Sequence, residues 1–375
     1  MRKHIIYRYF LFLSLVGLMQ LTLSCSSSSN EIEPLKPEGE DTPLEKDEYT
    51  FMNVEYRKWQ NGTFQAWTTA DSRETRTIDN MNWYTPSSDY SRTAWGGRIG
   101  LQPSSVVGKE GFFRVANCGG RSYLLDPDNG AVIIHGIQHV RPGESTAHKK
   151  AFGTRYGSEA RWSEETGKLL ADNHINYISY GSNRIEVFPA AVRGNLLTPK
   201  TQKIAYAENL YLLRTFMWDM SKNLGYAFDD DKYNRLVLLF EPTFATYIDR
   251  LVQEKSALFA GDRHFIGFYL DNELPFASYQ GTGYANTEGG GWLVHTQKNR
   301  GEFYQNFCLR LLETRNCVGW VHFEYNDGYD SNGKASNKGV VSIEYEPYES
   351  FLSHMRQLNL SVHSLIDYND TKSVQ

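Results

Sequence analysis

From residue 131 onward, apolar runs of strand length alternate with segments of helical periodicity, and this alternation constrains the fold more than any other feature of the chain. Alternating strands and helices are typical of a parallel sheet with helices packed outside it. The sequence therefore predicts an α/β fold. The expected strands are 131–137, 174–180, 209–218, 265–270 and 317–325, and the expected helices are 159–172, 243–259, 301–313 and 347–358.

The spacing of the expected strands suggests a barrel, but too few strand-helix units are present to close one of eight strands. A (β/α)8 barrel takes about 250 residues, hence about 31 for each unit. The first four strands are spaced by one unit or slightly more, whereas only residues 274–316 separate the fourth from the strand that begins at Cys317. That stretch holds about one unit and part of another. Either the barrel is incomplete, or the last strand is not the eighth.

The region before the predicted barrel has a different texture. Residues 50–125 are rich in Trp, Tyr, Thr, Arg and Gly without a sustained helical period, which predicts a β-rich layer of short strands and loops beginning near Tyr49. The segment 123–130 reads as a strand followed by an Asp-Pro-Asp-Asn-Gly turn. With the next apolar run it predicts a hairpin that leads into the first core strand.

The first 48 residues lie outside the predicted fold. A basic start and the apolar stretch 10–23 precede Ser24 and Cys25, which is the order of an export signal, and the stretch is short for a membrane span. Cys25 and the four serines after it resemble the lipid-attachment site of bacterial lipoproteins; a cleaved secretory signal is the alternative. We expect removal of 1–24, a lipidated flexible tether over 25–48, and an outer-membrane lipoprotein facing the periplasm or cell surface.

Charge and cysteine content exclude several classes of partner. The net charge of −5 provides no positive excess to neutralise phosphates, so neither nucleic acid nor an anionic membrane surface is expected, and membrane attachment is through the lipid alone. Apart from Cys25, the cysteines are three in number, an odd count that does not indicate a disulfide framework. No Cys and His spacing suggests zinc, so we expect no metal and no cofactor.

The strongest chemical signal lies at the end of the fourth expected strand. The apolar run 264–270 stops abruptly at Asp271, Asn272 and Glu273, which places an amide and a carboxylate where a barrel strand ends. Hydrolysis of a glycosidic bond needs one carboxyl group to protonate the leaving oxygen, and Glu273 suits that role, with Asn272 beside it to bind a sugar hydroxyl. A loop cap or a surface ion pair is the alternative interpretation.

A set of stretches extends this signal along the chain between about residue 95 and residue 367. The set comprises Gly267-Phe-Tyr-Leu-Asp-Asn-Glu-Leu-Pro275 together with 111–115, 125–128, 136–143, 286–292, 296–301, 317–320 and 337–348. As a set and in this order, they resemble the agarase-like enzymes of glycoside hydrolase family 50 and related lipoproteins of Bacteroidetes.

The resemblance implies a (β/α)8 barrel over 126–367, preceded by the β-rich region 49–125, and a retaining enzyme acting on β-galactosidic polysaccharide. It also implies that Glu273 is the acid/base and Asn272 its substrate-binding neighbour. The family's nucleophile is a second Glu at the end of strand seven, shortly before the segment that matches 283–292. Here 276–284 contains no carboxylate. Resemblance and residue spacing therefore both indicate an internal loss covering about strands five to seven.

Other carboxylates are candidates to replace the missing nucleophile. Glu324 and Asp327 follow the last expected strand and are better placed to reach the barrel mouth than Glu288, in a glycine-rich loop, or Glu302, which suits the first turn of a helix. The matching family positions are not the nucleophile. The sequence also has His322 where the family pattern favours an aromatic residue of the sugar subsite.

Aromatic and polar side chains near the expected mouth complete the candidate site. Aromatic residues make up 14% of the chain, and such rings stack on sugar faces, although core packing is the alternative for each. The candidates for stacking on a galactose-type ring or for lining the mouth are Trp218, Trp292, Trp320, His139, Arg141 and Asn183. Packing at the barrel rim is the alternative for the tryptophans, and a structural role for the others.

These features leave three functional hypotheses. The first is an agarase-like retaining glycoside hydrolase acting on a galactan-type polysaccharide or oligosaccharide, inactive if its nucleophile is absent. The second is a non-catalytic glycan-binding surface lipoprotein that keeps aromatic stacking without the carboxylate pair. The third is a defective deletion product, whose open barrel exposes sheet edges and apolar faces that normally have partners.

Overall fold

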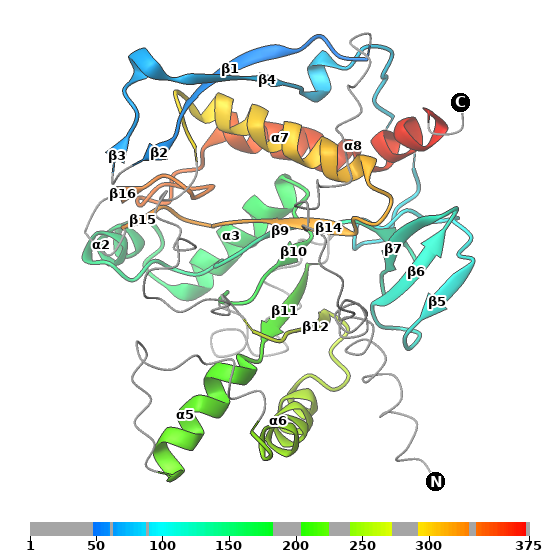
Figure 1. Ribbon diagram of the computed structural model, residues 1–375, viewed down its shortest axis with the longest axis vertical. Helices are drawn as coiled ribbons and strands as arrows, with labels where there is room; N and C mark the ends of the chain where they lie inside the picture. Colours follow the sequence, from blue (N-terminus) through cyan, green and yellow to red (C-terminus); the bar gives the residue numbers. More distant parts are fainter. Residues whose placement is uncertain are drawn as a thin grey trace, which may run out of the picture. The chain divides into compact units, whose positions relative to one another are not determined.

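A five-stranded parallel sheet lies at the centre of the fold (Figure 1). The structure is a computed structural model, and it describes residues 48–60, 63–87, 90–182, 204–224, 241–271, 292–329 and 335–372. In spatial order the strands are β12 (Phe265–Tyr269), β11 (Ala205–Asn209), β10 (Tyr177–Ile178), β9 (Ile134–Ile137) and β14 (Gly319–His322). All neighbouring pairs run parallel, which confirms the predicted α/β class. Within the described ranges β12 and β14 are the outer strands of this sheet, and no closed barrel is formed.

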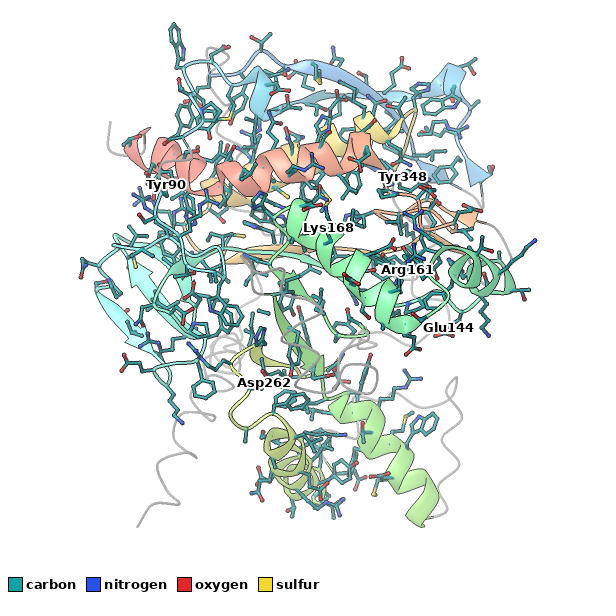
Figure 2. The ribbon with its side chains drawn as sticks, turned by 180° about the vertical axis from the view of Figure 1, so that it is seen from behind. Tyr90, Glu144, Arg161, Lys168, Asp262 and Tyr348 are labelled. Atoms are coloured by element: carbon teal, nitrogen blue, oxygen red, sulfur yellow. The ribbon has the colours of Figure 1, made fainter. Side chains whose placement is uncertain are left out.

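Six α-helices accompany the sheet in the described ranges, four of them where the sequence predicts helices. They are α2 (Thr146–Arg155), α3 (Glu159–Asp172), α5 (Leu212–Leu224), α6 (Phe244–Leu258), α7 (Gln297–Glu313) and α8 (Glu349–Lys372). α3 matches its prediction at both ends, and Ser158 fixes its start by accepting a hydrogen bond from the Arg161 N–H. Its outer face carries Arg161 and Lys168, which pair with carboxylates one turn away (Figure 2). None of these helices combines the length and the apolar character that a membrane crossing requires.

The predicted strand at 209–218 is wrong, because β11 ends at Asn209 and most of that run belongs to α5. The apolar residues of α5 that become buried, Leu213, Phe216 and Met217, follow helical spacing. They pack against Phe244 of α6. An apolar run by itself does not distinguish a strand from a helix, whereas the spacing of its buried residues does.

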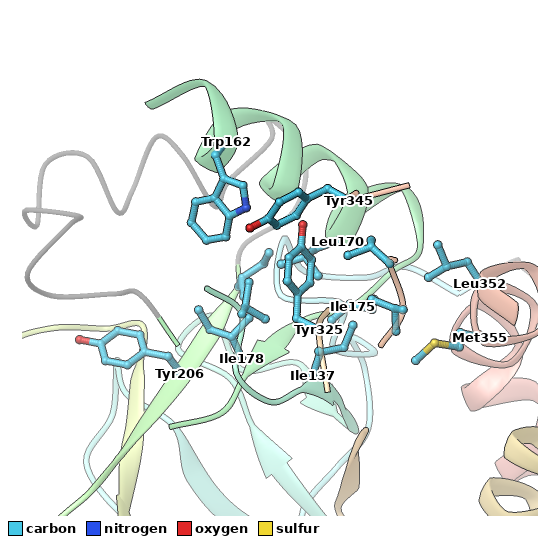
Figure 3. Packing of buried hydrophobic residues seen from close by; sticks show 14 of the residues in the cluster. Ile137, Trp162, Leu170, Ile175, Ile178, Tyr206, Tyr325, Tyr345, Leu352 and Met355 are labelled. Carbon is cyan, nitrogen blue, oxygen red and sulfur yellow. The ribbon is translucent and has the colours of Figure 1, made fainter. Parts of the chain in front are cut away.

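The core fills the space between the sheet and its helices. In one main cluster Ile137 and Ile178 from the strands meet Trp162 from α3 and Leu352 and Met355 from α8 (Figure 3). Burying each side chain of this size contributes about 1.5–3 kcal/mol relative to leaving it exposed. A second cluster joins α7 and α8 to strands of the region before the sheet. α3 and α8 therefore cover one face of the sheet.

Short antiparallel strands make up the region before the central sheet. One set pairs β1 (Met52–Arg57) with β4 (Asp71–Thr75) and β13 (Leu293–Val294). The other strands and short helices are β2 (Trp59–Gln60), β3 (Thr63–Phe64), η1 (Trp67–Thr69), η2 (Ile78–Asn80), β5 (Ser105–Val107), β6 (Arg114–Cys118), β7 (Arg121–Leu125) and β8 (Ala131–Val132), and a late pair is β15 (Gly328–Tyr329) with β16 (Ala335–Ser336).

The predicted hairpin before the first core strand is confirmed as β7 and β8, in which Leu125 lies opposite Ala131. Its turn is held by Asp126, whose Oδ1 accepts hydrogen bonds from the backbone N–H groups of Asp128 and Gly130. Side-chain acceptance of this kind is why Asp favours turns.

Arg121 at the start of β7 anchors the hairpin to the end of α8. Its side chain is 1% exposed and forms a bidentate pair with Asp370, at 3.0 Å from Nε and 2.7 Å from Nη2. We expect Arg121→Met to lower the free energy of unfolding by about 2–3 kcal/mol, because it leaves the partly covered carboxylate without its main partner. Urea denaturation measures this. Arg315→Met is the matched control. Arg315 is more exposed, and its contact with the same carboxylate is longer, at 3.5 Å, so its loss should cost under about 1 kcal/mol. Equal costs for both variants would contradict the prediction.

Candidate active site

The C-terminal ends of the five parallel strands lie along one edge of the sheet, which is where ligands bind in α/β folds. His139 follows β9, Tyr180 follows β10 and Glu324 follows β14, so the described chain brings these residues to that edge. Of the residues predicted from the sequence, Asn183, Asn272, Glu273 and the lipidation site Cys25 lie outside the described residues.

His139 and Glu324 form the most polar contact at this edge. His139 Nδ1 lies 3.2 Å from Glu324 Oε2, and the two side chains are 23% and 19% exposed. Their strands are direct neighbours, with Ile137 of β9 opposite His322 of β14. The ring of Phe323 stands edge-on to the His139 ring at 5.2 Å between centroids and is partly exposed. His139 is thus placed where the sequence analysis expects it, and Glu324 is the carboxylate that it contacts.

Gly181 provides the space that the His139 ring occupies. It has φ +76°, and a Cβ on this residue would lie 2.4 Å from His139 Cδ2. We expect Gly181→Ala to lower the free energy of unfolding by about 1–2 kcal/mol from the left-handed backbone alone, and to push the imidazole away from Glu324. Urea denaturation reports the first effect and the NMR chemical shifts of His139 report the second. Gly153→Ala, in α2 where a Cβ meets nothing within 4 Å, is the control and should not destabilise. Unchanged His139 resonances in the Gly181 variant would refute the displacement.

Four tyrosines, which we call the tyrosine cluster, line the same edge: Tyr177, Tyr180, Tyr211 and Tyr269. Tyr177 donates a hydrogen bond to the Tyr269 hydroxyl at 3.2 Å, and Tyr180 packs edge-on against Tyr269 at 4.9 Å and against Tyr211 at 6.2 Å. The sequence analysis did not name these residues. The available signal covered only Tyr180 and Tyr269, which lie at the ends of the expected strands 174–180 and 265–270, where a tyrosine supplies both a stacking surface and a hydroxyl.

A groove of about 270 Å³ lies on the face of the sheet opposite the main core. Gly136 makes room for the ring of Tyr177, which lines the groove, since a Cβ there would lie 2.4 Å from Tyr177 Cδ1. The groove is mostly apolar, with tyrosine hydroxyls at its rim, which suits the apolar face of a sugar ring. Its lining includes Ile134, Tyr177, Ala207, Ile266, Tyr269 and Val321.

Two of the carboxylates near the strand ends accept hydrogen bonds from backbone N–H groups. Asp271 Oδ2 accepts a hydrogen bond from the Leu213 N–H at the start of α5, and burial raises the pKa of this carboxyl. Asp327 accepts from the Gly339 N–H at 2.8 Å and from the Tyr348 hydroxyl at 2.6 Å, and burial raises its pKa as well. Asp327 therefore fixes a loop, and this placement does not support it as a replacement nucleophile.

The remaining candidates are occupied elsewhere or lie outside the described ranges. Glu302 is buried in the second turn of α7, because the helix begins at Gln297 rather than Gly301, and it lies beside Lys298 and Asn299; the expected first-turn position is therefore wrong. Arg141 pairs with Glu144 in an exposed contact of 3.4 Å. Glu288 lies outside the described residues.

Trp320 borders the groove, but its indole is only 7% exposed and packs in the cluster with α7 and α8, so it offers a sugar ring little stacking surface. Successive side chains of a strand point to opposite faces, and Val321 takes the groove face. The Trp320 indole is therefore buried on the helix side, where Nε1 donates to the Tyr304 hydroxyl at 2.6 Å. His322 shares that side and lies against Phe351, so its departure from the family pattern does not alter the groove.

The other two predicted tryptophans, Trp292 and Trp218, lie on different parts of the fold and do not form a common surface for stacking on sugar. Trp292 stacks on Tyr56 of β1 at 4.1 Å and contacts Phe303 of α7, which places it with the antiparallel strands. Trp218 lies on α5, about 9 Å of helix rise beyond Leu212, and is exposed. Rim packing, the alternative interpretation, describes Trp292 better than stacking on a ligand. Across the described ranges, no group of three or more His, Cys, Asp or Glu side chains is arranged to hold a metal ion.

Comparison with known proteins identifies the fold. No protein-family model and no curated protein matches the sequence. Among solved structures, a crystal structure of BpGH50 is similar with a TM-score of 0.68 and 18% identity, over 86% of this chain and 96% of that one. An agarase, AgWH50C, has a TM-score of 0.46 at 12% identity over 75% and 67% of the two chains, and an exo-β-agarase has 0.44 at 11% over 75% and 68%. The chain therefore has the fold of a glycoside hydrolase family 50 structure.

Proposed function

We propose that this chain is an agarase-like retaining glycoside hydrolase that acts on β-galactosidic polysaccharide. The observation that carries the proposal is the edge of the parallel sheet where His139, Glu324 and the tyrosine cluster come together beside an apolar groove. The sequence places Asn272 and Glu273 directly after Asp271, which is two residues beyond the end of β12. The similarity to BpGH50 supports the fold that this chemistry uses.

In this proposal Glu273 protonates the glycosidic oxygen and Asn272 binds a neighbouring hydroxyl. A retaining enzyme needs a second carboxyl group about 5–5.5 Å from the first. Glu324 follows β14, and β12 and β14 are opposite outer strands of the described sheet. Strand order therefore gives no reason to assign Glu324 as the nucleophile. The absence of a carboxylate from 276–284 supports an incomplete (β/α)8 barrel in this proposal.

Release of reducing sugar from agarose and related galactans tests the hydrolase proposal. A hydrolase of this type releases oligosaccharides from at least one galactan, and product analysis then distinguishes endo from exo action. No release from a broad panel of galactans by folded protein would overturn the catalytic proposal.

A non-catalytic glycan-binding protein is the second candidate. It is favoured by one observation: the described edge contains a stacking surface and polar groups, whereas no second carboxylate is assigned as nucleophile. Such a protein binds galactans on a glycan array with the same affinity after Glu273→Gln. A defective deletion product, by contrast, aggregates or melts without cooperativity, and resequencing the gene would restore the missing strands together with a Glu.

We also propose that the chain is an outer-membrane lipoprotein, attached through Cys25. Expressed with its first 24 residues, the wild-type protein should incorporate radiolabelled palmitate and fractionate with membranes. Cys25→Ser should abolish the label and release the folded chain into the soluble fraction, because the lipid is the expected anchor. Cys118→Ser, at a buried thiol, is the control and should keep the label. A labelled Cys25 variant would show that lipid is attached elsewhere.

A further inference from the structure

The contact between His139 and Glu324 leaves two hydrogen-bond acceptors for a ligand. When Nδ1 of the neutral imidazole carries the proton, it donates to Glu324 Oε2 at 3.2 Å, and His139 Nε2 then has a free lone pair. Glu324 Oε1 has no protein partner among the described contacts and is not buried. Both atoms accept, so they call for a ligand that donates twice.

The surroundings hold this pair in place. The His139 ring fills the space above Gly181, and the Glu324 backbone N–H donates to the Lys338 carbonyl at 3.3 Å. Four fifths of each side chain is covered, which limits the positions that the carboxylate and imidazole can adopt. A pair that is already ordered loses little entropy when it binds a ligand.

An exposed ring lies beside the two acceptors. Phe323 is 44% exposed, packs edge-on to His139, and has the Lys338 ammonium 5.6 Å from its centroid. An apolar surface next to polar acceptors matches the amphipathic character of a sugar, which has an apolar face and a rim of hydroxyl groups.

From this arrangement we propose that Glu324, Phe323 and His139 form a sugar subsite that binds two adjacent hydroxyl groups of one residue of the glycan. Glu324 Oε1 accepts from one hydroxyl and His139 Nε2 from the other, while Phe323 contacts the apolar face of the ring. His139 is in addition the positioning residue for Glu324. The inference rests on the proposed function as a glycan-acting protein, and it makes Glu324 a specificity-determining residue with no role as nucleophile.

Affinity and turnover of matched variants test the subsite. Glu324→Gln keeps the shape but lets the amide turn a donor toward the ligand, and it should weaken binding of galactan oligosaccharides at least about tenfold, raising KM while leaving kcat within about twofold. His139→Asn keeps a donor near the position of Nδ1 and should retain more affinity than His139→Ala. Glu346→Gln, at an exposed carboxylate paired with Arg155, is the control and should bind as wild type.

The outcomes separate the subsite from the proposed function. Binding is measured on a glycan array that includes galactans and unrelated glycans, with thermal melts to confirm folding. If wild type binds a galactan and Glu324→Gln binds it equally, the subsite is overturned and the proposed function stands. If Glu324→Gln lowers kcat at unchanged KM, Glu324 is a nucleophile and the subsite is overturned. Loss of binding to a glycan that is not a galactan supports the subsite and overturns the galactan assignment. A folded wild type that binds no glycan overturns both.

Discussion

Glu273→Gln is expected to lower the rate of reducing-sugar release from agarose by about 10²–10⁴-fold, the usual contribution of a general acid/base. Glutamine keeps the size of the side chain and its ability to hydrogen-bond, but it has no proton to give to the glycosidic oxygen. The variant should fold normally and still bind oligosaccharide. Initial rates with agarose, compared at equal concentrations of folded protein, measure the effect.

Asp271→Asn is the matched control for that variant. It removes a carboxylate two residues away, yet asparagine Oδ1 can still accept the Leu213 N–H that Asp271 accepts at the start of α5. We expect its rate to stay within about threefold of wild type, a change of under about 1 kcal/mol in activation free energy. A Glu273 variant that keeps the wild-type rate, or a control that loses as much, would remove Glu273 from the acid/base role.

The parallel sheet was predictable because buried parallel strands are apolar on both faces. The runs that contain β9, β12 and β14 carry this signal, and their positions were predicted within a few residues. β11 carries it poorly, since it includes Glu208 and ends at Asn209, while the apolar residues of α5 follow directly. The most apolar stretch in that region is therefore α5. The position of β11 is set by its packing in the sheet rather than by its local composition.

The candidate site was predictable only in its parts. His139 and Glu324 are far apart in the sequence, and they meet because β9 and β14 pair side by side, a topology that no local pattern specifies. The orientation of Trp320 likewise depends on the packing of β14, since its indole lies in the cluster with α7 and α8 although the residue also borders the groove. The sequence indicated polar groups after the strands, but which of them meet depends on the pairing of the strands in the sheet.

Acidification is expected to destabilise the fold strongly through two histidines that are buried behind the sheet. His135 lies on β9 and His363 on α8, with 5% and 1% of their surface exposed. Burial lowers the pKa of His135 to about 3, with a further decrease from His363, and burial with the nearby Arg92 guanidinium lowers the pKa of His363 to about 4. The native state thus holds both rings neutral at pH values where the unfolded chain, with a histidine pKa of 6.5, is protonated.

The sign of the effect follows from proton linkage. Between pH 6.5 and about 4 the unfolded state binds more protons than the native state, so stability rises with pH in this window and falls on acidification. The contribution is fully present above pH 6.5. For His363 a decrease from 6.5 to about 4 corresponds to about 3 kcal/mol at 1.36 kcal/mol per unit, and His135 adds a comparable amount. Because whole domains are stable by about 5–15 kcal/mol, we expect urea midpoints to decrease steeply from pH 6.5 to pH 4.5.

A substitution isolates the histidine contribution from that of the carboxyl groups. Burial raises the pKa of Asp126, Asp271 and Asp327, which by the same linkage makes them favour the native state at low pH and oppose the histidines. His363→Gln keeps a donor for the Gly96 carbonyl, which His363 Nε2 contacts at 3.2 Å, but does not titrate. The slope of unfolding free energy against pH between 4.5 and 6 should therefore decrease by about 1 kcal/mol per pH unit in this variant. Equal slopes in the wild type and the variant would rule out His363 as a cause of acid sensitivity.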